Sequence, residues 1–190
     1  MKKINFCFIF VIICLSFIKI IGSLDSGIVN ILKDLSIILT VFIPYILKNK
    51  FHVNLGEGFI FIYLIFIFLA HYLGVICGYY NEWDGFDKLT HFLSGFLTSY
   101  VAVLIFSKSN GKGVLFGILF IISFTWMCAG LWEVFEFVCD NLFGGDAQRV
   151  LETGVTDTMM DMIVAFVGSI IVTVYEFVFN RRIFYEGKGL

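Results

Sequence analysis

GVLFGILFIISFTWMCAGLWEVFEFV, residues 113–138, decides the fold. It carries no charge before Glu133, and a helix needs about 20 such apolar residues to cross the hydrocarbon core of a bilayer. Five further predominantly apolar stretches of similar length lie at residues 4–21, 28–47, 57–78, 88–107 and 157–179. The sequence therefore predicts an all-α polytopic transmembrane helix bundle of about six spans, in a single membrane domain over residues 1–190.

The composition supports lipid as the main surroundings. Of the 190 residues, 59% are hydrophobic and 15% are charged, whereas a soluble domain of this size has about 25% charged residues. The five cysteines form no CxxC pair, which gives no support for a zinc ribbon or redox motif. No run of like charges is present, so we expect a bilayer and not a nucleic acid as partner.

The first two stretches are the weakest. Lys2 and Lys3 before an apolar run resemble the start of a signal peptide, but no clear small-residue cleavage signature follows. We therefore favour a retained anchor, and a cleaved signal peptide stays open as the alternative. Lys33 and Asp34 interrupt the second stretch.

The basic residues predict the orientation. With six spans, one side receives most of the thirteen: Lys2, Lys3, Lys48, Lys50, Lys108, Lys112, Arg181, Arg182 and Lys188. Loops rich in Lys and Arg stay in the cytoplasm. We therefore expect a multi-pass protein of the cell (plasma or inner) membrane with both termini cytoplasmic.

Acidic residues and one histidine gather at the opposite, outer ends of three spans. Asp87 and His91 open the fourth span, Glu133, Glu136 and Asp140 close the fifth, and Asp157 and Asp161 open the sixth. Within each set the spacing is three or four residues, which places the side chains on one helix face. The sequence thus predicts that the three sets meet at one depth.

Six carboxylates and an imidazole at that depth suggest a divalent metal. Carboxylates inside a membrane are costly, and a bound cation would offset their repulsion. Carboxylates with one imidazole suit zinc, manganese, magnesium or iron. The expected metal ligands are Asp87, His91, Glu133, Glu136, Asp157 and Asp161, with Glu133, Glu136 and Asp161 as the catalytic candidates.

These polar residues are also consistent with purely structural roles. Asp87 and Asp157 suit helix N-termini, where acids stabilise the dipole. His91 and His71 are equally typical of interior hydrogen-bonding histidines, and Glu136 and Asp140 of interface charges. Glu176 is interpreted as an inner-interface charge near Arg181 and Arg182.

The loop at residues 141–154 is long enough to cover the site. Gly144, Gly145 and Gly154 permit tight turns there. The loop carries Gln148 and Arg149, which with Asp140 are the candidates for substrate contact, since a guanidinium suits phosphate or carboxylate.

Three motifs carry a family resemblance: Asp87-Lys-Leu-Thr-His91-Phe-Leu-Ser-Gly95, Trp132-Glu133-Val-Phe-Glu136-Phe and Asp157-Thr158-Met-Met-Asp161-Met. Over residues 57–180 the chain resembles the bacterial DUF2238 family, the YjdF-like inner-membrane proteins. The first and last motifs are also similar to VanZ-like membrane proteins, which are linked to glycopeptide resistance. The resemblance implies the fold and the polar positions but no reaction.

Three function classes stay open. The first is a divalent-metal-dependent enzyme acting on a lipid or cell-envelope precursor at the outer leaflet. The second is a non-catalytic accessory or resistance protein, and the third is a cation- or proton-coupled transporter. No serine or cysteine nucleophile motif is present, which disfavours covalent catalysis.

Overall fold

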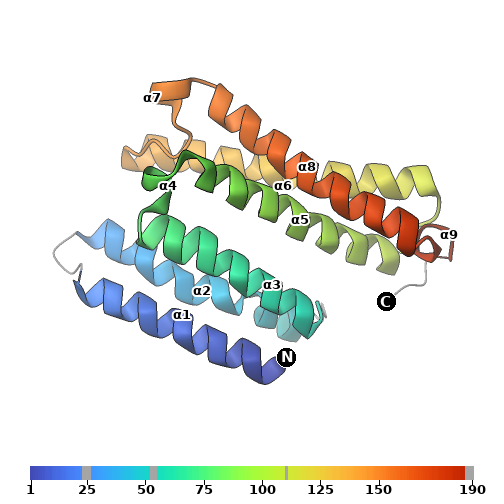
Figure 1. The fold of residues 1–190 in the computed structure, drawn as a ribbon, viewed down its shortest axis with the longest axis horizontal. Coiled ribbons are helices and arrows are strands. Elements are labelled where there is room, and N and C mark those ends of the chain that lie inside the picture. The colour runs from blue at the N-terminus through green and yellow to red at the C-terminus, as the bar shows by residue number, and fades with distance from the viewer. Residues whose placement is uncertain (23–26, 52–54, 110, 187–190) are drawn as a thin grey trace. The chain divides into compact units, whose positions relative to one another are not determined.

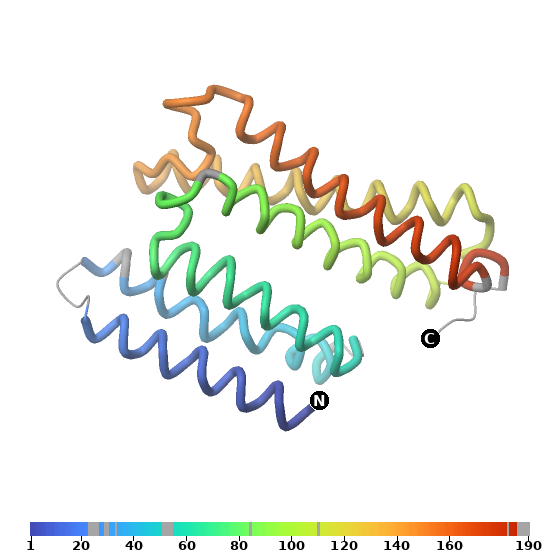
Figure 2. The backbone as a smooth tube through the Cα atoms, in the orientation of Figure 1, coloured from blue at the N-terminus to red at the C-terminus, as the bar shows by residue number. Residues whose placement is uncertain are grey.

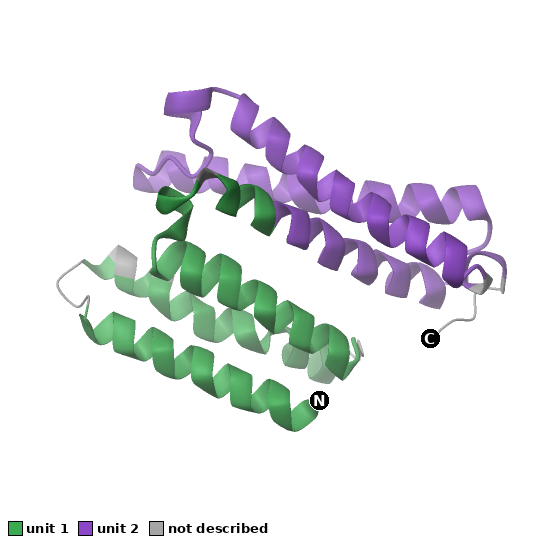
Figure 3. Ribbon diagram, in the orientation of Figure 1, with its two compact units in different colours: residues 1–90 green, residues 91–190 purple. Residues whose placement is uncertain are grey.

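The computed structural model describes residues 1–22, 27–51, 55–109 and 111–186, and all regular structure in these ranges is helical (Figure 1). Contacts divide the chain into two compact units, Met1–Thr90 and His91–Leu190 (Figure 3). The all-α prediction is confirmed. The interpretation as a single membrane domain stays a prediction.

Unit 1 contains α1 (Lys2–Gly22), α2 (Ile28–Phe51), α3 (Glu57–Ile67), η2 (Phe68–Ile76), α4 (Tyr79–Glu82) and the first turns of α5 (Asp84–Lys108). Its long helices pack against one another, with α1 against α2, α3 and η2. Asn5 of α1 is fully buried, and its amide donates to the backbone carbonyl of Glu57 at 3.0 Å and to Glu57 Oε2 at 2.9 Å. These bonds tie α1 to the start of α3.

The third span differs from the single regular helix that the sequence predicts over residues 57–78. Its second half, η2, is a nine-residue π-helix. The following residue, Cys77, keeps the same pattern, because its N–H donates to the carbonyl of Tyr72, five residues earlier, at 2.9 Å. The wider turn is a property of this segment that hydropathy does not reveal.

Unit 2 contains the rest of α5, followed by α6 (Val114–Phe143), α7 (Val150–Thr153), α8 (Thr156–Phe179) and α9 (Arg182–Glu186). Helices α5, α6 and α8 form a three-helix bundle (Figure 2). The hydroxyl oxygens of Ser99 and Thr125 lie 2.8 Å apart and join α5 to α6. Gly95 and Gly168 let α5 and α8 touch, since a methyl group on Gly95 would overlap the carbonyl oxygen of Ala165.

An apolar cluster fills the end of unit 2 where α5 and α8 finish. It consists of Ala102, Val103, Phe106, Ile121, Val172, Ile183 and Phe184, all buried. Helix α9 closes this end, and the N–H of Gly113 donates to the carbonyl of Phe184 at 2.8 Å. The polar residues described below therefore occupy the opposite end of the bundle.

Five described helical stretches are long and apolar enough to cross a membrane: Lys2–Gly22, Glu57–Ile76, Gly85–Lys108, Val114–Phe143 and Thr156–Phe179. Helix α2 has 24 residues but is not among these five, in keeping with the charges at Lys33 and Asp34. A bundle of about six spans fits these helices. Helix α6 continues five residues beyond its predicted end at Val138. It ends at Phe143 because the next residue, Gly144, has a left-handed backbone with φ of 72°.

Candidate metal site

The site lies in unit 2, where the first turns of α8 and the His91 end of α5 meet the last third of α6. Helix α6 runs opposite to the other two, so Glu133 near its end reaches the depth of His91 and Asp161 near their beginnings. The sequence predicted this convergence, because all three polar sets lie at the outer ends of their spans. Within unit 2, ligand atoms of His91, Glu133 and Glu136 lie close together, and a ligand atom of Asp161 lies close to one of His91.

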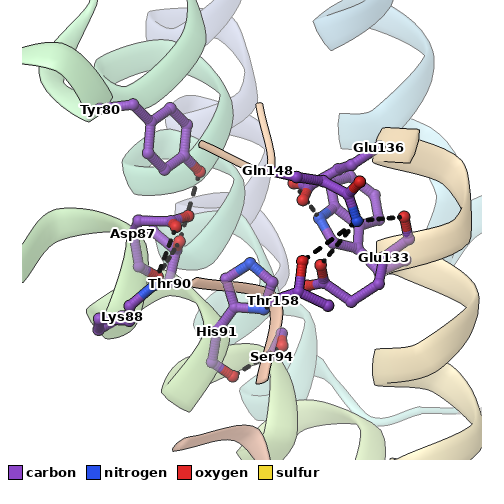
Figure 4. Close-up of polar contacts among 11 residues, drawn as sticks. Tyr80, Asp87, Lys88, Thr90, His91, Ser94, Glu133, Glu136, Gln148 and Thr158 are labelled. Carbon is purple, nitrogen blue, oxygen red and sulfur yellow. Dashed lines mark hydrogen bonds and ion pairs between the residues drawn. The ribbon is translucent and has the colours of Figure 1, made fainter. Parts of the chain in front are cut away.

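His91, Glu133 and Glu136 form the centre of the site. Each offers one ligand atom, and these three atoms lie within 4.8 Å of one another (Figure 4). His91 Nδ1 lies 3.9 Å from Glu133 Oε1, and these side chains are 7% and 6% exposed. Glu136 is partly buried on the next turn of α6. This spacing leaves room for one cation between the three side chains.

Asp161 contributes a further carboxylate from α8. A ligand atom of Asp161 also lies within 4.8 Å of one of His91, and the residue is only 1% exposed. Asp157, one turn earlier, is buried in the first turn of α8, a position that also suits the helix dipole. Its carboxylate is not part of the group around His91, so its role as a ligand stays a prediction.

Asp87 belongs to unit 1 and stands one helical turn before His91 on α5. Lys88 Nζ lies 3.5 Å from Asp87 Oδ2. The backbone carbonyl of Asp87 accepts a 2.8 Å hydrogen bond from Thr90, whose hydroxyl in turn accepts one from Tyr80 at 3.4 Å (Figure 4). The helical spacing of Asp87 and His91 is as expected, and metal binding by Asp87 stays a prediction.

Trp132 supports Glu136, and the sequence analysis assigned it no role. Its indole Nε1 donates to Glu136 Oε1 at 2.8 Å. The two residues are four apart on α6, so helical spacing gave a signal for this pair. The indole thus binds one oxygen of a carboxylate in the candidate metal site.

The loop after α6 covers the Glu133 side of the site. Asp140 binds the loop, accepting hydrogen bonds from the backbone N–H groups of Ala147 at 2.9 Å and Gln148 at 3.1 Å. The Gln148 side chain is buried and contacts Glu133 and Thr158 (Figure 4). Thr158 was given no role in the sequence analysis, although it stands between Asp157 and Asp161 in the third motif. The lid expected from the loop's length is therefore anchored at two points.

Arg149 has a left-handed backbone, with φ of 50°, and starts α7. Its carbonyl accepts bonds from the N–H groups of Glu152 at 3.1 Å and Thr153 at 2.9 Å. Substrate contact by Asp140, Gln148 and Arg149 stays a prediction, since two of them already hold the loop.

His71 in unit 1 is a helix-packing residue, as its structural interpretation expected. Its Nε2 lies 3.1 Å from Ser36 Oγ and its Nδ1 lies 3.5 Å from Thr40 Oγ1, both on α2. Thr40 also accepts a 2.8 Å bond from the Tyr63 hydroxyl at its carbonyl. These polar contacts join η2, through His71, and α3, through Tyr63, to α2.

Comparison with known proteins identifies the family. Residues 4–182 match DUF2238, a family described as predicted membrane proteins. The chain belongs to the DUF2238 family. The match begins at residue 4 and therefore includes α1 and α2, which the resemblance over residues 57–180 left out.

No curated protein and no solved structure matches the chain. The DUF2238 assignment thus gives membership of a membrane-protein family without a reaction or a ligand. The similarity to VanZ-like proteins stays a prediction.

Proposed function

We propose that this DUF2238 protein is a membrane enzyme that binds a divalent metal in unit 2 and acts on a lipid or cell-envelope precursor. The observation that carries the proposal is the group formed by His91, Glu133 and Glu136, whose ligand atoms lie within 4.8 Å of one another. The nearby Asp161 would complete the ligand set.

Electrostatics favour a cation at this position. His91, Glu133 and Asp161 are each at most 6% exposed, and two carboxylates in an apolar bundle repel each other and lose hydration. A divalent ion would offset both costs. One imidazole with carboxylate oxygens is a donor set that suits zinc, manganese or iron.

The depth of the site favours an amphiphilic substrate. Helix α6 has 30 residues, or about 45 Å, so it exceeds a hydrocarbon core of about 30 Å. Glu133 and Glu136 then lie near the membrane–water boundary. Leu142, Phe143 and Leu151, close by in sequence, are each at least 67% exposed, which suits contact with lipid. A substrate with a polar head and apolar tails would reach the site from the bilayer.

A metal at this position would polarise a phosphoryl or acyl oxygen, or activate a water molecule. Glu133, Glu136 and Asp161 are the proposed ligands or bases. Arg149 is the proposed contact for an anionic headgroup. Asp87 and Asp157 are proposed as further ligands, brought in by helical spacing from His91 and Asp161.

We also propose that both termini are cytoplasmic and that the site opens to the outer side of the cell membrane. The distribution of Lys and Arg supports this orientation. Single cysteines introduced at Glu152 of α7 and at Lys112, in a cysteine-free background, test it. Labelling of the Glu152 position alone by an impermeant maleimide on intact cells is expected, and the reverse would overturn the topology.

The first test is the metal content of detergent-purified protein, measured by mass spectrometry after growth with zinc, manganese and iron. We expect near-stoichiometric metal in the wild type and loss in Glu133→Gln and Asp161→Asn. Glu152→Gln, on the exposed α7 segment, is the matched control and should keep its metal. Absence of metal from the wild type would reject the proposal and favour a non-catalytic accessory role.

Cation- or proton-coupled transport is the second candidate, favoured by the buried face of α8. This face carries Asp157, Asp161, Ala165, Ser169, Thr173 and Glu176, all buried. From the first to the last is about 28 Å along the helix, close to the thickness of the hydrocarbon core. Proton or cation uptake by liposomes containing the wild type, absent with Glu176→Gln, would support transport over enzymatic activity.

A further inference from the structure

The loop after α6 returns to the helix that it leaves. Gly144 ends α6 with φ of 72°, and its N–H donates to the carbonyl of Asp140 at 2.9 Å. The two carboxylate oxygens of Asp140 then accept the N–H groups of Ala147 and Gln148. The backbone at Gln148 is therefore fixed by a residue two turns beyond Glu133 on the same helix.

The side chain of Gln148 points inward from this anchored backbone. The two hydrogens of its Nε2 are shared among three acceptors: the backbone carbonyl of Glu133 at 3.1 Å, Glu133 Oε2 at 3.4 Å and Thr158 Oγ1 at 3.2 Å (Figure 4). Gln148 is only 8% exposed, so little water competes for these bonds. One amide thus links α6 to the beginning of α8.

The two carboxylate oxygens of Glu133 therefore have different neighbours. Oε2 faces the amide of Gln148, whereas Oε1 faces His91 Nδ1 at 3.9 Å. A carboxylate can rotate about its last side-chain bond, and a donor on one oxygen limits that rotation. Residues that hydrogen-bond to metal ligands orient them in this way, and their loss typically lowers metal affinity 10- to 100-fold.

We propose that Gln148 is a positioning residue for the metal site: it holds Glu133 Oε2 so that Oε1 faces the metal beside His91. This inference rests on the proposed metal site. It gives the loop a role in metal binding, and Asp140 assists by fixing the backbone of Gln148. It also replaces substrate contact as the principal role of the Gln148 side chain.

The test compares metal affinity with fold stability in the full-length chain. Titration of detergent-purified, metal-free protein with Mn²⁺, followed by electron paramagnetic resonance, gives both the affinity and the symmetry of the site. Gln148→Leu keeps the approximate size but removes the donor. We expect Mn²⁺ binding to weaken about 10- to 100-fold, with a changed spectrum and a melting temperature of the metal-free protein that changes little.

Gln148→Glu is the second variant, because it keeps the shape and replaces the donor with a third carboxylate beside Glu133. We expect weaker Mn²⁺ binding here too, or an altered spectrum if the new carboxylate becomes a ligand. Thr153→Ala is the control: it lies on the same loop, and its hydroxyl bonds only to the carbonyl of Arg149 among the contacts described. It should bind Mn²⁺ as the wild type does.

The outcomes separate the two proposals. Wild-type protein that binds neither Mn²⁺ nor Zn²⁺ would reject the metal site and this inference with it. Wild-type binding that stays unchanged in both Gln148→Leu and Gln148→Glu would leave the metal site standing and overturn the positioning role. Equal losses in the Gln148 variants and in Thr153→Ala would also overturn it, because any disturbance of the loop would then suffice.

Discussion

His91 Nδ1 lies 3.9 Å from Glu133 Oε1, although the residues belong to different helices of unit 2. A cation bound between these two side chains is expected to stabilise the folded state of unit 2. A ligand that binds only the folded state stabilises it by about 2.7 kcal/mol when its concentration is 100 times its Kd.

We expect Zn²⁺ or Mn²⁺ to raise the melting temperature of the wild type by several degrees. The same ions should raise that of His91→Ala and Glu133→Gln much less. The measurement is thermal unfolding in detergent with and without metal, with EDTA as the reversal. An equal rise in all three proteins would indicate binding elsewhere.

Gly95 lies where α5 and α8 touch, and its replacement should destabilise unit 2. The added methyl of Gly95→Ala would overlap backbone atoms of Ala165, which have no rotamer to move into. Overpacking of this kind costs about 1–3 kcal/mol. Thermal unfolding in detergent measures the loss.

Gly130→Ala is the matched control for Gly95→Ala. The nearest atom that its methyl would meet is Met162 Cε at 3.8 Å, an ordinary contact with a flexible side chain. We expect a change within about 0.5 kcal/mol or a slight gain, since Ala favours a helix more than Gly does. A loss equal to that of Gly95→Ala would mean that the close approach is not the cause.

The bond between Ser99 and Thr125 should contribute little despite its burial. Each hydroxyl also lies within hydrogen-bond distance of a carbonyl oxygen of its own helix, Ser99 of Gly95 at 2.7 Å and Thr125 of Ile121 at 3.2 Å, so the hydroxyl that donates between the helices has an acceptor of its own when its partner is removed. Removing one partner therefore leaves the other satisfied. Interhelical hydrogen bonds in membranes average about 0.6 kcal/mol.

A double-mutant cycle of Ser99→Ala and Thr125→Val measures this coupling by thermal unfolding. We expect an interaction energy below about 1 kcal/mol. A coupling of several kcal/mol would show that the pair, and not the glycine contact of α5 with α8, holds the bundle together.

Asn5 should be important for the stability of unit 1. Asn5→Ala removes two hydrogen bonds from a fully buried side chain to the partly exposed Glu57, which predicts a loss of about 1–3 kcal/mol. Cys7→Ala, on an exposed face of the same helix, should change the stability by less than about 0.5 kcal/mol. Proteolysis of α1 at increasing temperature distinguishes the two variants.

The packing of α1 also favours its retention over cleavage as a signal peptide. Ile9, Ile12 and Ile20 are buried in unit 1, as is Asn5. Removal of residues 1–22 would expose their partners on α2 and α3. We expect the intact mass of the purified protein to include this segment, and a mass that lacks it would support the signal-peptide alternative.

The spans were predictable because membrane helices are marked by length and composition alone. The convergence of His91, Glu133 and Asp161 was predictable because each residue lies at the outer end of its span. The sequence interpretation made Glu176 an interface charge, although helical spacing from Asp161 would have placed it on the buried face of α8. It is 4% exposed, because it continues the buried face that carries Asp161, Ala165 and Ser169.

Other features depend on contacts that a linear pattern does not contain. The inward direction of Gln148 depends on Asp140, which binds the loop backbone seven and eight residues later. The π-helical turns of η2 also leave no mark in hydropathy, since the apolar run is continuous there.

The π-helix η2 changes which residues of the third span share one helix face. A π-turn takes in more residues than an α-turn, so the residues within and after η2 are rotated relative to those of α3. Deleting one residue between Phe68 and His71 would favour an ordinary α-helical register and turn the imidazole away from Ser36 and Thr40 on α2. We therefore expect the third span to tolerate substitutions on its exposed face more readily than a change in its length.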